Sequence, residues 1–299
     1  MTTRGDQPPT DTRRWLDEDG NEIDETDRGL VYDLRTLVDR RRVLGLFGGV
    51  SAAALLAACG GGSGGSGQGS TATTAASGAT TTTAGSVSSG GDLSEVPEET
   101  GGPFPGDGSN GPNVLDDSGV VRGDIRSSFG SSTTTAEGVP LAIRLTVRDA
   151  ASGDAVEGAG VYLWHCDRDG NYSLYSQGVT GENYLRGAQE ADANGAVTFT
   201  SIFPACYSGR WPHIHFEVYA SLADATSSGP IVKTSQIALP KEACEAVYAT
   251  PGYEQSVANL SQVSLAGDNV FGDDGGIHQL ATMSGDPTGG YTAALTIGV

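Results

Sequence analysis

Short segments rich in β-branched and aromatic residues dominate the sequence from about Asp92 onward. They alternate with clusters of Gly, Asn and Asp, and no stretch sustains a 3.6-residue hydrophobic period. We expect an all-β fold, a sandwich or a barrel, because roughly 200 residues of short strands are typical of those architectures. The expected strands are 141–147, 160–165, 196–200, 213–220, 231–239 and 291–297; one short helix is expected at 241–248, and turns at Asp169-Gly170 and Asn194-Gly195.

An uncharged segment precedes this folded part. Gly60–Gly91 contains almost nothing but Gly, Ser, Thr and Ala. Such a composition buries too little apolar surface to offset the entropy lost on ordering, so we expect a flexible tether over 59–93. The remaining residues, 94–299, then form a single domain.

The first 58 residues resemble an export signal. Arg40-Arg41-Arg42 precede an apolar stretch, Val43–Ala58, whose 16 residues are fewer than the ~20 needed to span a bilayer. The arginines resemble a twin-arginine signal, and Leu56-Ala57-Ala58-Cys59 resembles a bacterial lipobox. We therefore expect an exported protein, either lipidated at Cys59 and anchored to the outer face of the cell membrane or secreted. The alternative is a buried apolar helix beside incidental arginines.

The charge of the chain excludes one class of partner. The full sequence carries 37 acidic and 17 basic side chains, a net charge of −20. Removal of residues 1–58 takes away 11 acids and 8 bases, which leaves 26 against 9 and a charge of −17. Phosphate backbones repel such a chain, so we expect no nucleic-acid partner.

Two histidines stand two residues apart within one expected strand. Side chains alternate between the faces of a strand, so His213 and His215 project from the same face, about 7 Å apart along the strand. That spacing suits two ligands of one metal, although two surface histidines would give the same pattern. With His165 as a third ligand, a zinc-dependent hydrolase is a further alternative.

Two tyrosines are the other candidate ligands. Tyr172 lies in Asp169-Gly-Asn-Tyr-Ser173 and Tyr207 in Phe203-Pro-Ala-Cys-Tyr207. Either one alone is more typical of a core residue. Because a free phenol has a pKa of ~10, phenolate near neutral pH requires a strong Lewis acid such as ferric iron.

Taken together, these motifs resemble the intradiol ring-cleavage dioxygenases, which include the catechol 1,2- and protocatechuate 3,4-dioxygenases. The resemblance covers about residues 95–299. It rests on the following motifs: Glu99-Thr-Gly-Gly-Pro-Phe104, Trp164-His165, Gly170-Asn-Tyr-Ser173, Pro204-Ala-Cys-Tyr207 and Arg210-Trp-Pro-His-Ile-His215.

The resemblance implies a prealbumin-like antiparallel β-sandwich and a mononuclear, non-haem Fe(III). Its ligands would be Tyr172, Tyr207, His213 and His215, with Tyr207 as the ligand that catechol displaces. Arg210 would stabilise negative charge on the substrate, and Gln236 would line the pocket. The reaction would cleave a catechol-type ring between its two hydroxylated carbons with O₂, giving a cis,cis-muconate-type diacid.

The sequence departs from many catechol enzymes in two ways. Only two residues separate Tyr207 from Arg210, and the long helical dimerisation segment is replaced by signal and tether. The identity of the catechol therefore stays open, as does the oligomeric state, with a homodimer as one option.

Three cysteines remain once Cys59 is set aside, and they allow three single bridges. We favour Cys206–Cys244, next to an expected ligand. A non-catalytic prealbumin-like module that binds a surface partner is the alternative to an enzyme, since both share the sandwich.

Overall fold

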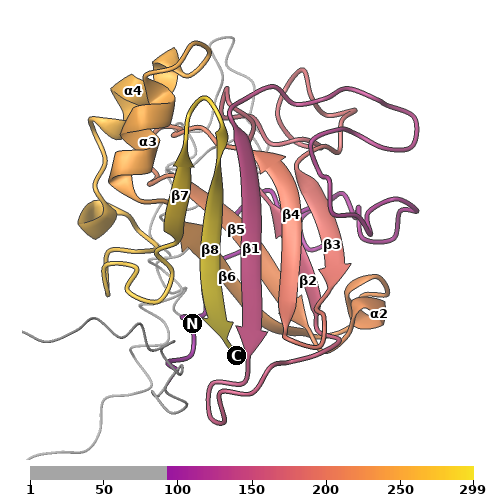
Figure 1. The fold of residues 1–299 in the computed structure, drawn as a ribbon. Helices are drawn as coiled ribbons and strands as arrows, with labels where there is room; N and C mark the ends of the chain where they lie inside the picture. Colours follow the sequence, from indigo (N-terminus) through magenta and orange to yellow (C-terminus); the bar gives the residue numbers. More distant parts are fainter. Residues whose placement is uncertain (1–92) are drawn as a thin grey trace, which may run out of the picture. The chain divides into compact units, whose positions relative to one another are not determined.

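The computed structural model describes residues 93–299, and these residues form two four-stranded sheets packed face to face (Figure 1). The predicted β-sandwich is confirmed. The expected signal, the lipidation at Cys59 and nearly all of the tether lie outside the described residues. Within residues 93–299, no helix combines the length and the apolar character that crossing a membrane requires.

The first sheet has the strand order β4-β1-β8-β7. These strands are β1 (Pro140–Arg148), β4 (Ala196–Ile202), β7 (Thr282–Asp286) and β8 (Gly290–Gly298). One strand pair departs from the antiparallel arrangement, because β8 runs parallel to β1. The C-terminal strand inserts between β1 and β7, and its direction there is set by the tight turn from β7.

The second sheet has the order β3-β2-β5-β6 and is antiparallel throughout. These strands are β2 (Gly160–Trp164), β3 (Arg186–Glu190), β5 (His213–Tyr219) and β6 (Ile231–Ala238). Every residue of the central strand β5 is buried, so both of its faces are covered.

The two faces of β5 have different neighbours. Ile214, Phe216 and Val218 point into the main hydrophobic core between the sheets, together with alternate residues of β1 such as Ile143 and Leu145. His213 and His215 point to the opposite face, which the loops cover. On that face a second cluster includes Trp164 and Tyr172. One face of β5 therefore belongs to the hydrophobic core, and the other face carries His213 and His215.

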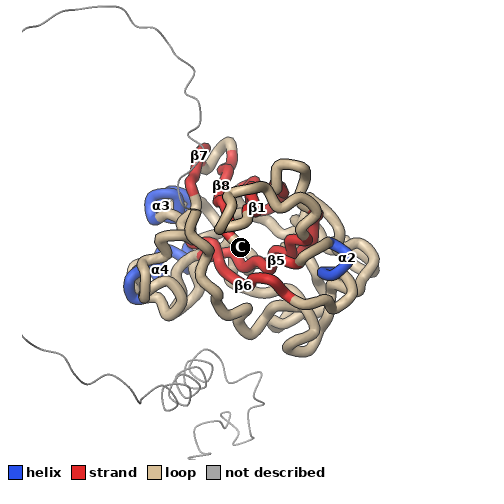
Figure 2. The backbone as a smooth tube through the Cα atoms, turned by 90° about the horizontal axis from the view of Figure 1, so that it is seen from below, coloured by secondary structure: helices blue, strands red, loops and turns tan. Residues whose placement is uncertain are grey.

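Short helices lie at the edges of the sandwich (Figures 1 and 2). α2 (Leu222–Ala225) lies at the β2–β3 side, whereas α3 (Lys241–Tyr248) packs beside β7 and α4 (Glu254–Leu260) packs against α3. A 3₁₀ turn, η3 (Leu265–Gly267), follows α4. The expected helix at 241–248 is confirmed with its bounds, whereas α2 and α4 were not expected.

Candidate metal centre

The histidine pair lies at the start of β5, and its two rings face the same point. Nε2 of His213 and Nε2 of His215 are 3.1 Å apart, and both side chains are buried. The expectation that alternation places both imidazoles on one face is therefore met. Nδ1 of His213 donates to the Trp211 carbonyl at 2.6 Å, so its Nε2 carries the free lone pair. The His215 ring is instead stacked on Trp164, at 4.9 Å between centroids.

Tyr172 reaches the same point from the loop after β2. The carboxylate of Asp167 accepts hydrogen bonds from the backbone N–H groups of Asp169 and Asn171, which closes the turn predicted at this place. Gly170 has φ +90°, and a Cβ there would lie 3.3 Å from Cβ of Tyr207. This turn therefore brings the two tyrosine loops into contact.

Tyr207 comes from the loop after β4, and α4 holds that loop in place. The N–H of Cys206 donates to Ser256 Oγ at 3.0 Å, and Asn259 Nδ2 donates to the Cys206 carbonyl at 2.8 Å. Both partners are in α4, a helix that the sequence analysis missed. The backbone next to Tyr207 is thereby fixed on both sides.

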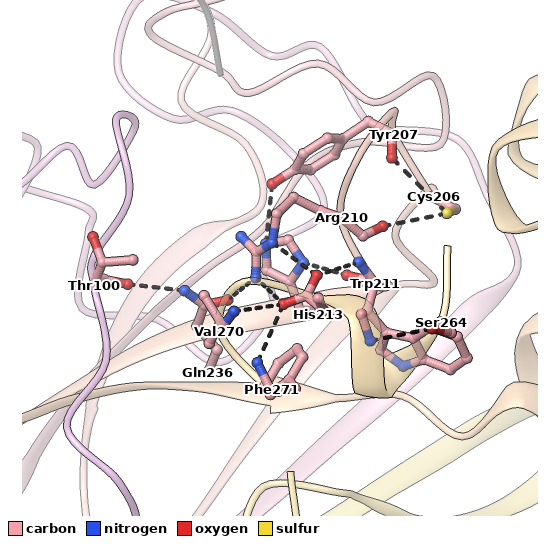
Figure 3. Close-up of polar contacts among 12 residues, drawn as sticks. Thr100, Cys206, Tyr207, Arg210, Trp211, His213, Gln236, Ser264, Val270 and Phe271 are labelled. Atoms are coloured by element: carbon pink, nitrogen blue, oxygen red, sulfur yellow. Dashed lines mark hydrogen bonds and ion pairs between the residues drawn. The ribbon is translucent and has the colours of Figure 1, made fainter. Parts of the chain in front are cut away.

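The four expected ligand atoms form one compact set (Figure 3 shows Tyr207 and His213). The Tyr207 hydroxyl is 3.1 Å from His213 Nε2, and the Tyr172 hydroxyl is 3.2 Å from His215 Nε2. The Tyr172 hydroxyl also lies 3.5 Å from both the Tyr207 hydroxyl and His213 Nε2. A metal with bonds of about 2.0–2.1 Å holds neighbouring ligands roughly 3 Å apart, so the four donors fit one ion. Two phenol oxygens in this set favour a hard, strongly acidic ion.

The protonation states also suit a metal. Burial lowers the pKa of His213 and of His215 well below the usual range, and the Arg210 charge acts in the same direction. Both imidazoles are therefore neutral and free to coordinate. Burial raises the pKa of Tyr207 to about 12, against the opposing effect of Arg210, and raises the pKa of Tyr172 well above its usual value. Only a strong Lewis acid would convert these phenols to phenolates at neutral pH.

Arg210 lies beside this set and is held by two side chains (Figure 3). Its Nε donates to Asp268 at 3.0 Å, and its Nη2 donates to Gln236 Oε1 at 2.7 Å. Gln236 in turn donates to the Thr100 carbonyl at 2.9 Å. Within the described residues Nη1 has no hydrogen-bond partner, which leaves it free for a substrate.

Asp268 is a site residue that the sequence analysis missed. Its buried carboxylate also accepts from the N–H groups of Trp211, Val270 and Phe271, at 2.7, 2.9 and 3.3 Å. Arg210 and Asp268 are 58 positions apart in the chain. In the sequence, Gly267-Asp268-Asn269 indicates only a turn, so no local signal marks this contact.

Arg186 is a second residue that was missed. From β3 it donates to the carbonyl and hydroxyl of Ser173 at 2.9 and 3.0 Å, next to Tyr172. It also donates to the carbonyls of Phe104 and Pro105, at 2.9 and 2.7 Å. This buried guanidinium therefore ties the Tyr172 loop to the segment that precedes β1.

His165 does not join the metal-ligand set. Its Nε2 lies 2.6 Å from Ser201 Oγ and its Nδ1 lies 2.7 Å from the Cys166 carbonyl, so both ring nitrogens are occupied. Among residues 93–299, no group of three or more His, Cys, Asp and Glu could hold a metal. The geometry gives no support to the zinc hydrolase alternative.

The expected Cys206–Cys244 bridge is not present in the structure. Cys166, Cys206 and Cys244 are buried and free. Each thiol of the expected pair has a backbone acceptor of its own: Cys206 Sγ lies 3.5 Å from the Arg210 carbonyl, and Cys244 Sγ lies 3.8 Å from the Leu239 carbonyl. This expectation is therefore corrected.

Comparison with known proteins supports the resemblance seen in the motifs. Residues 126–217 match the family model described as Dioxygenase. A curated relative, the chlorocatechol 1,2-dioxygenase of Rhodococcus opacus, is 39% identical over 62 residues, or 21% of this chain. That match spans 24% of the length of the relative.

Solved structures similar to the chain show the same fold. The intradiol ring-cleavage dioxygenase from Tetranychus urticae aligns with a TM-score of 0.54 and 22% identity, over 69% of this chain and 94% of that chain. A second dioxygenase structure gives a TM-score of 0.55, with the same identity and coverage. At this identity the likeness establishes the fold, which is the sandwich built by these dioxygenases.

Proposed function

We propose that this chain is a non-haem Fe(III)-dependent intradiol dioxygenase. It would cleave a catechol-type ring between the two hydroxylated carbons with O₂ and release a cis,cis-muconate-type diacid. The observation that carries the proposal is the set of two phenol oxygens and two imidazole nitrogens, 3.1–3.5 Å apart, beside the free Nη1 of Arg210. A module that only binds a partner has no need of such a set.

Tyr172, Tyr207, His213 and His215 would hold the iron. When bound, ferric iron supplies the Lewis acidity that converts the phenols and the catechol to their anions and makes the ring reactive toward O₂. The two imidazoles are neutral, so the phenolates supply the negative charge that offsets the ion.

The two tyrosines would have different roles because their exposure differs. Tyr172 is only 2% exposed, whereas Tyr207 is partly exposed at the loop between β4 and β5. Tyr207 is therefore the ligand that a substrate can displace, and Tyr172 is the permanent one. Once displaced, the Tyr207 oxygen would accept and retain a catechol proton, because the Tyr207 phenol has a pKa of about 12.

Arg210 would act on the substrate, and its neighbours would position it. With Nε and Nη2 held by Asp268 and Gln236, the guanidinium is fixed before substrate arrives and directs Nη1 at developing negative charge. Gln236 is thus a positioning residue as well as part of the pocket wall.

Oxygen uptake tests this function directly. The iron-loaded protein should consume about one O₂ per unsubstituted catechol, with ultraviolet absorbance of a muconate-type diacid growing in step. Tyr207→Phe and Arg210→Gln should each lower the rate, while Tyr291→Phe, on β8, should not. Uptake without diacid, or no uptake by iron-loaded protein, would rule out intradiol cleavage.

We also propose that the protein acts outside the cytoplasm, held by a lipid at Cys59. The order of Arg40-Arg41-Arg42, the apolar stretch Val43–Ala58 and Cys59 supports this location. Its substrate would then be a small aromatic diol that reaches the outer face of the membrane. The sequence leaves the oligomeric state open, a homodimer included.

A further inference from the structure

Arg186 on β3 lies next to the Tyr172 loop, and every nitrogen of its guanidinium donates a hydrogen bond. Nε and Nη2 donate to the hydroxyl and the carbonyl of Ser173, at 3.0 and 2.9 Å. Nη2 also donates to the Phe104 carbonyl at 2.9 Å, and Nη1 donates to the Pro105 carbonyl at 2.7 Å and the Tyr162 hydroxyl at 3.2 Å. The residue is only 1% exposed, so these bonds are made away from water.

The charge of this arginine has no carboxylate partner. All of its acceptors are neutral oxygens, and among residues 93–299 Arg186 forms no ion pair. A buried guanidinium is costly unless it is paired or fully hydrogen-bonded. Here the rigid planar fork joins three segments that are far apart in the chain: the segment before β1, strand β2 and the Tyr172 loop.

The hydrogen bonds of Arg186 reach Tyr172 by two routes. The first passes through the backbone, because Ser173 follows Tyr172 directly. The second passes through Phe104, whose ring lies 5.1 Å from the Tyr172 ring and whose carbonyl accepts from Nη2. Arg186 therefore fixes both the backbone next to Tyr172 and an aromatic ring that packs against it.

Backbone strain flanks the contact between Arg186 and Ser173. Leu174 follows Ser173 and has φ +74°, and Leu185 precedes Arg186 and has φ +57°. In the part of the chain that the structure describes, only one other non-glycine residue, Ser228, has a positive φ. A leucine keeps this conformation only where its surroundings hold it there, and such strain is typical of ligand clamps.

We propose that Arg186 is a positioning residue that holds Tyr172 in its metal-binding position before iron arrives. This inference rests on the proposed function, because it concerns a ligand of that same iron site. The guanidinium fork holds the strained loop in one conformation, so the Tyr172 oxygen lies beside the two imidazoles without help from the metal. Without the fork, iron binding would also have to order the loop, and the iron affinity would fall by that cost.

The first test compares four forms of the full chain: wild type, Arg186→Lys, Ser173→Ala and Arg148→Lys. Arg186→Lys keeps the charge but loses the fork, and Ser173→Ala removes one acceptor and decides the question if Arg186→Lys does not fold. Arg148→Lys is the control, because Arg148 on β1 also donates to a backbone carbonyl, that of Gly153, but lies in the other sheet.

In a titration with Fe(III) supplied as its citrate complex, Arg186→Lys should bind iron about 10- to 100-fold more weakly than wild type. The tyrosinate-to-iron absorbance per bound iron should also fall, because fewer ions would have Tyr172 as a ligand. Ser173→Ala should change both in the same direction by less, and Arg148→Lys should change neither. Lower stability to urea with unchanged iron affinity and absorbance per iron would overturn the inference.

Hydrogen exchange of the metal-free protein separates this inference from the proposed function. The N–H of Tyr172 donates to Ser176 Oγ at 2.9 Å, and that of Leu174 donates to the Val179 carbonyl at 3.2 Å. Both N–H groups should exchange faster in Arg186→Lys than in wild type, and unchanged exchange would overturn the role of Arg186. A wild type that binds no Fe(III) would instead overturn the proposed function, while the exchange rates would still decide whether Arg186 orders this loop.

Discussion

The raised pKa of the Glu99 carboxyl should make the free energy of unfolding depend on pH. Its folded pKa is about 7, compared with the ordinary 4.5, so it stays protonated in the folded chain over a range where the unfolded chain ionises. Its contribution to the free energy of unfolding is therefore complete below about pH 4.5 and is lost as the pH rises through about 7. Between pH 5 and pH 8, stability should fall less in Glu99→Gln than in wild type.

Urea unfolding of the metal-free protein at those two pH values measures this difference. Glu157→Gln, on the exposed connection between β1 and β2, is the matched control and should retain the wild-type difference. An identical pH difference in Glu99→Gln would contradict the assigned protonation of Glu99.

Asp268 should act on catalysis only through Arg210. Asp268→Asn keeps the shape of the side chain but removes the charge that holds the guanidinium, and we expect kcat/KM for catechol to fall about 10- to 100-fold. If the effect passes through Arg210, the double variant with Arg210→Gln should be no slower than Arg210→Gln alone.

Asp286→Asn is the control for that comparison. Asp286 is the exposed last residue of β7, and its carboxylate accepts from the N–H groups of Thr288 and Gly289 in the turn that follows. Unlike Asp268, it has no arginine partner within residues 93–299. Losses that multiply in the Asp268–Arg210 double variant would show a separate structural role for Asp268.

At the scale of one residue, sequence patterns predict only how residues close together in the chain are placed relative to one another. His213 and His215 could be placed on one face because the side-chain period of a strand is two. Tyr172 and Tyr207 could be placed only by family resemblance, because the turn that joins their loops depends on tertiary contact. Asp268 could not be found, since its partner Arg210 is 58 positions away and both lie outside strands and helices.

At the scale of elements, the turn around Gly170 determines whether the two tyrosine loops can meet. Gly170→Ala places a methyl group 3.3 Å from Cβ of Tyr207 and forces an L residue to φ +90°. Gly153→Ala is a matched control, because Gly153 also has positive φ, at +76°, but has nothing within 4 Å of its Cβ position.

Both alanine variants should lose about 1–2 kcal/mol of unfolding free energy from backbone strain. Only Gly170→Ala should also weaken iron binding, because only there does the new methyl group press on Tyr207. Urea unfolding and iron titration measure the two effects separately. Equal iron affinity in both variants would show that the close approach at Gly170 does not position Tyr207.

The elements themselves were predictable where their residue types are characteristic. β5 and β1 are rich in Val, Ile, Leu and aromatics and were expected. β3 reads Arg-Gly-Ala-Gln-Glu and β7 reads Thr-Met-Ser-Gly-Asp; neither pattern favours a strand, and each is formed by pairing with a neighbour. The missed α4 has only seven residues, which is too short for a clear helical period.

At the scale of the whole molecule, a lipid on Cys59 would determine where the protein is found. In cells, the full chain should sediment with the membrane fraction, and Cys59→Ala should move it to the soluble fraction without changing oxygen uptake per iron. Cys206→Ala is the comparison, because that thiol lies within the folded domain and offers no lipidation motif. A Cys59→Ala protein that still sediments with membranes would contradict the lipid anchor.

The central claim is that two tyrosines and two histidines bind one ferric ion, and iron content with visible absorbance tests it most directly. Wild type expressed with ample iron should contain about one iron per chain and be red-brown from tyrosinate-to-iron charge transfer. Tyr172→Phe and His213→Ala should lose both iron and colour, whereas Tyr291→Phe should keep both. A colourless, iron-free wild type, or variants that retain full iron and colour, would contradict the account.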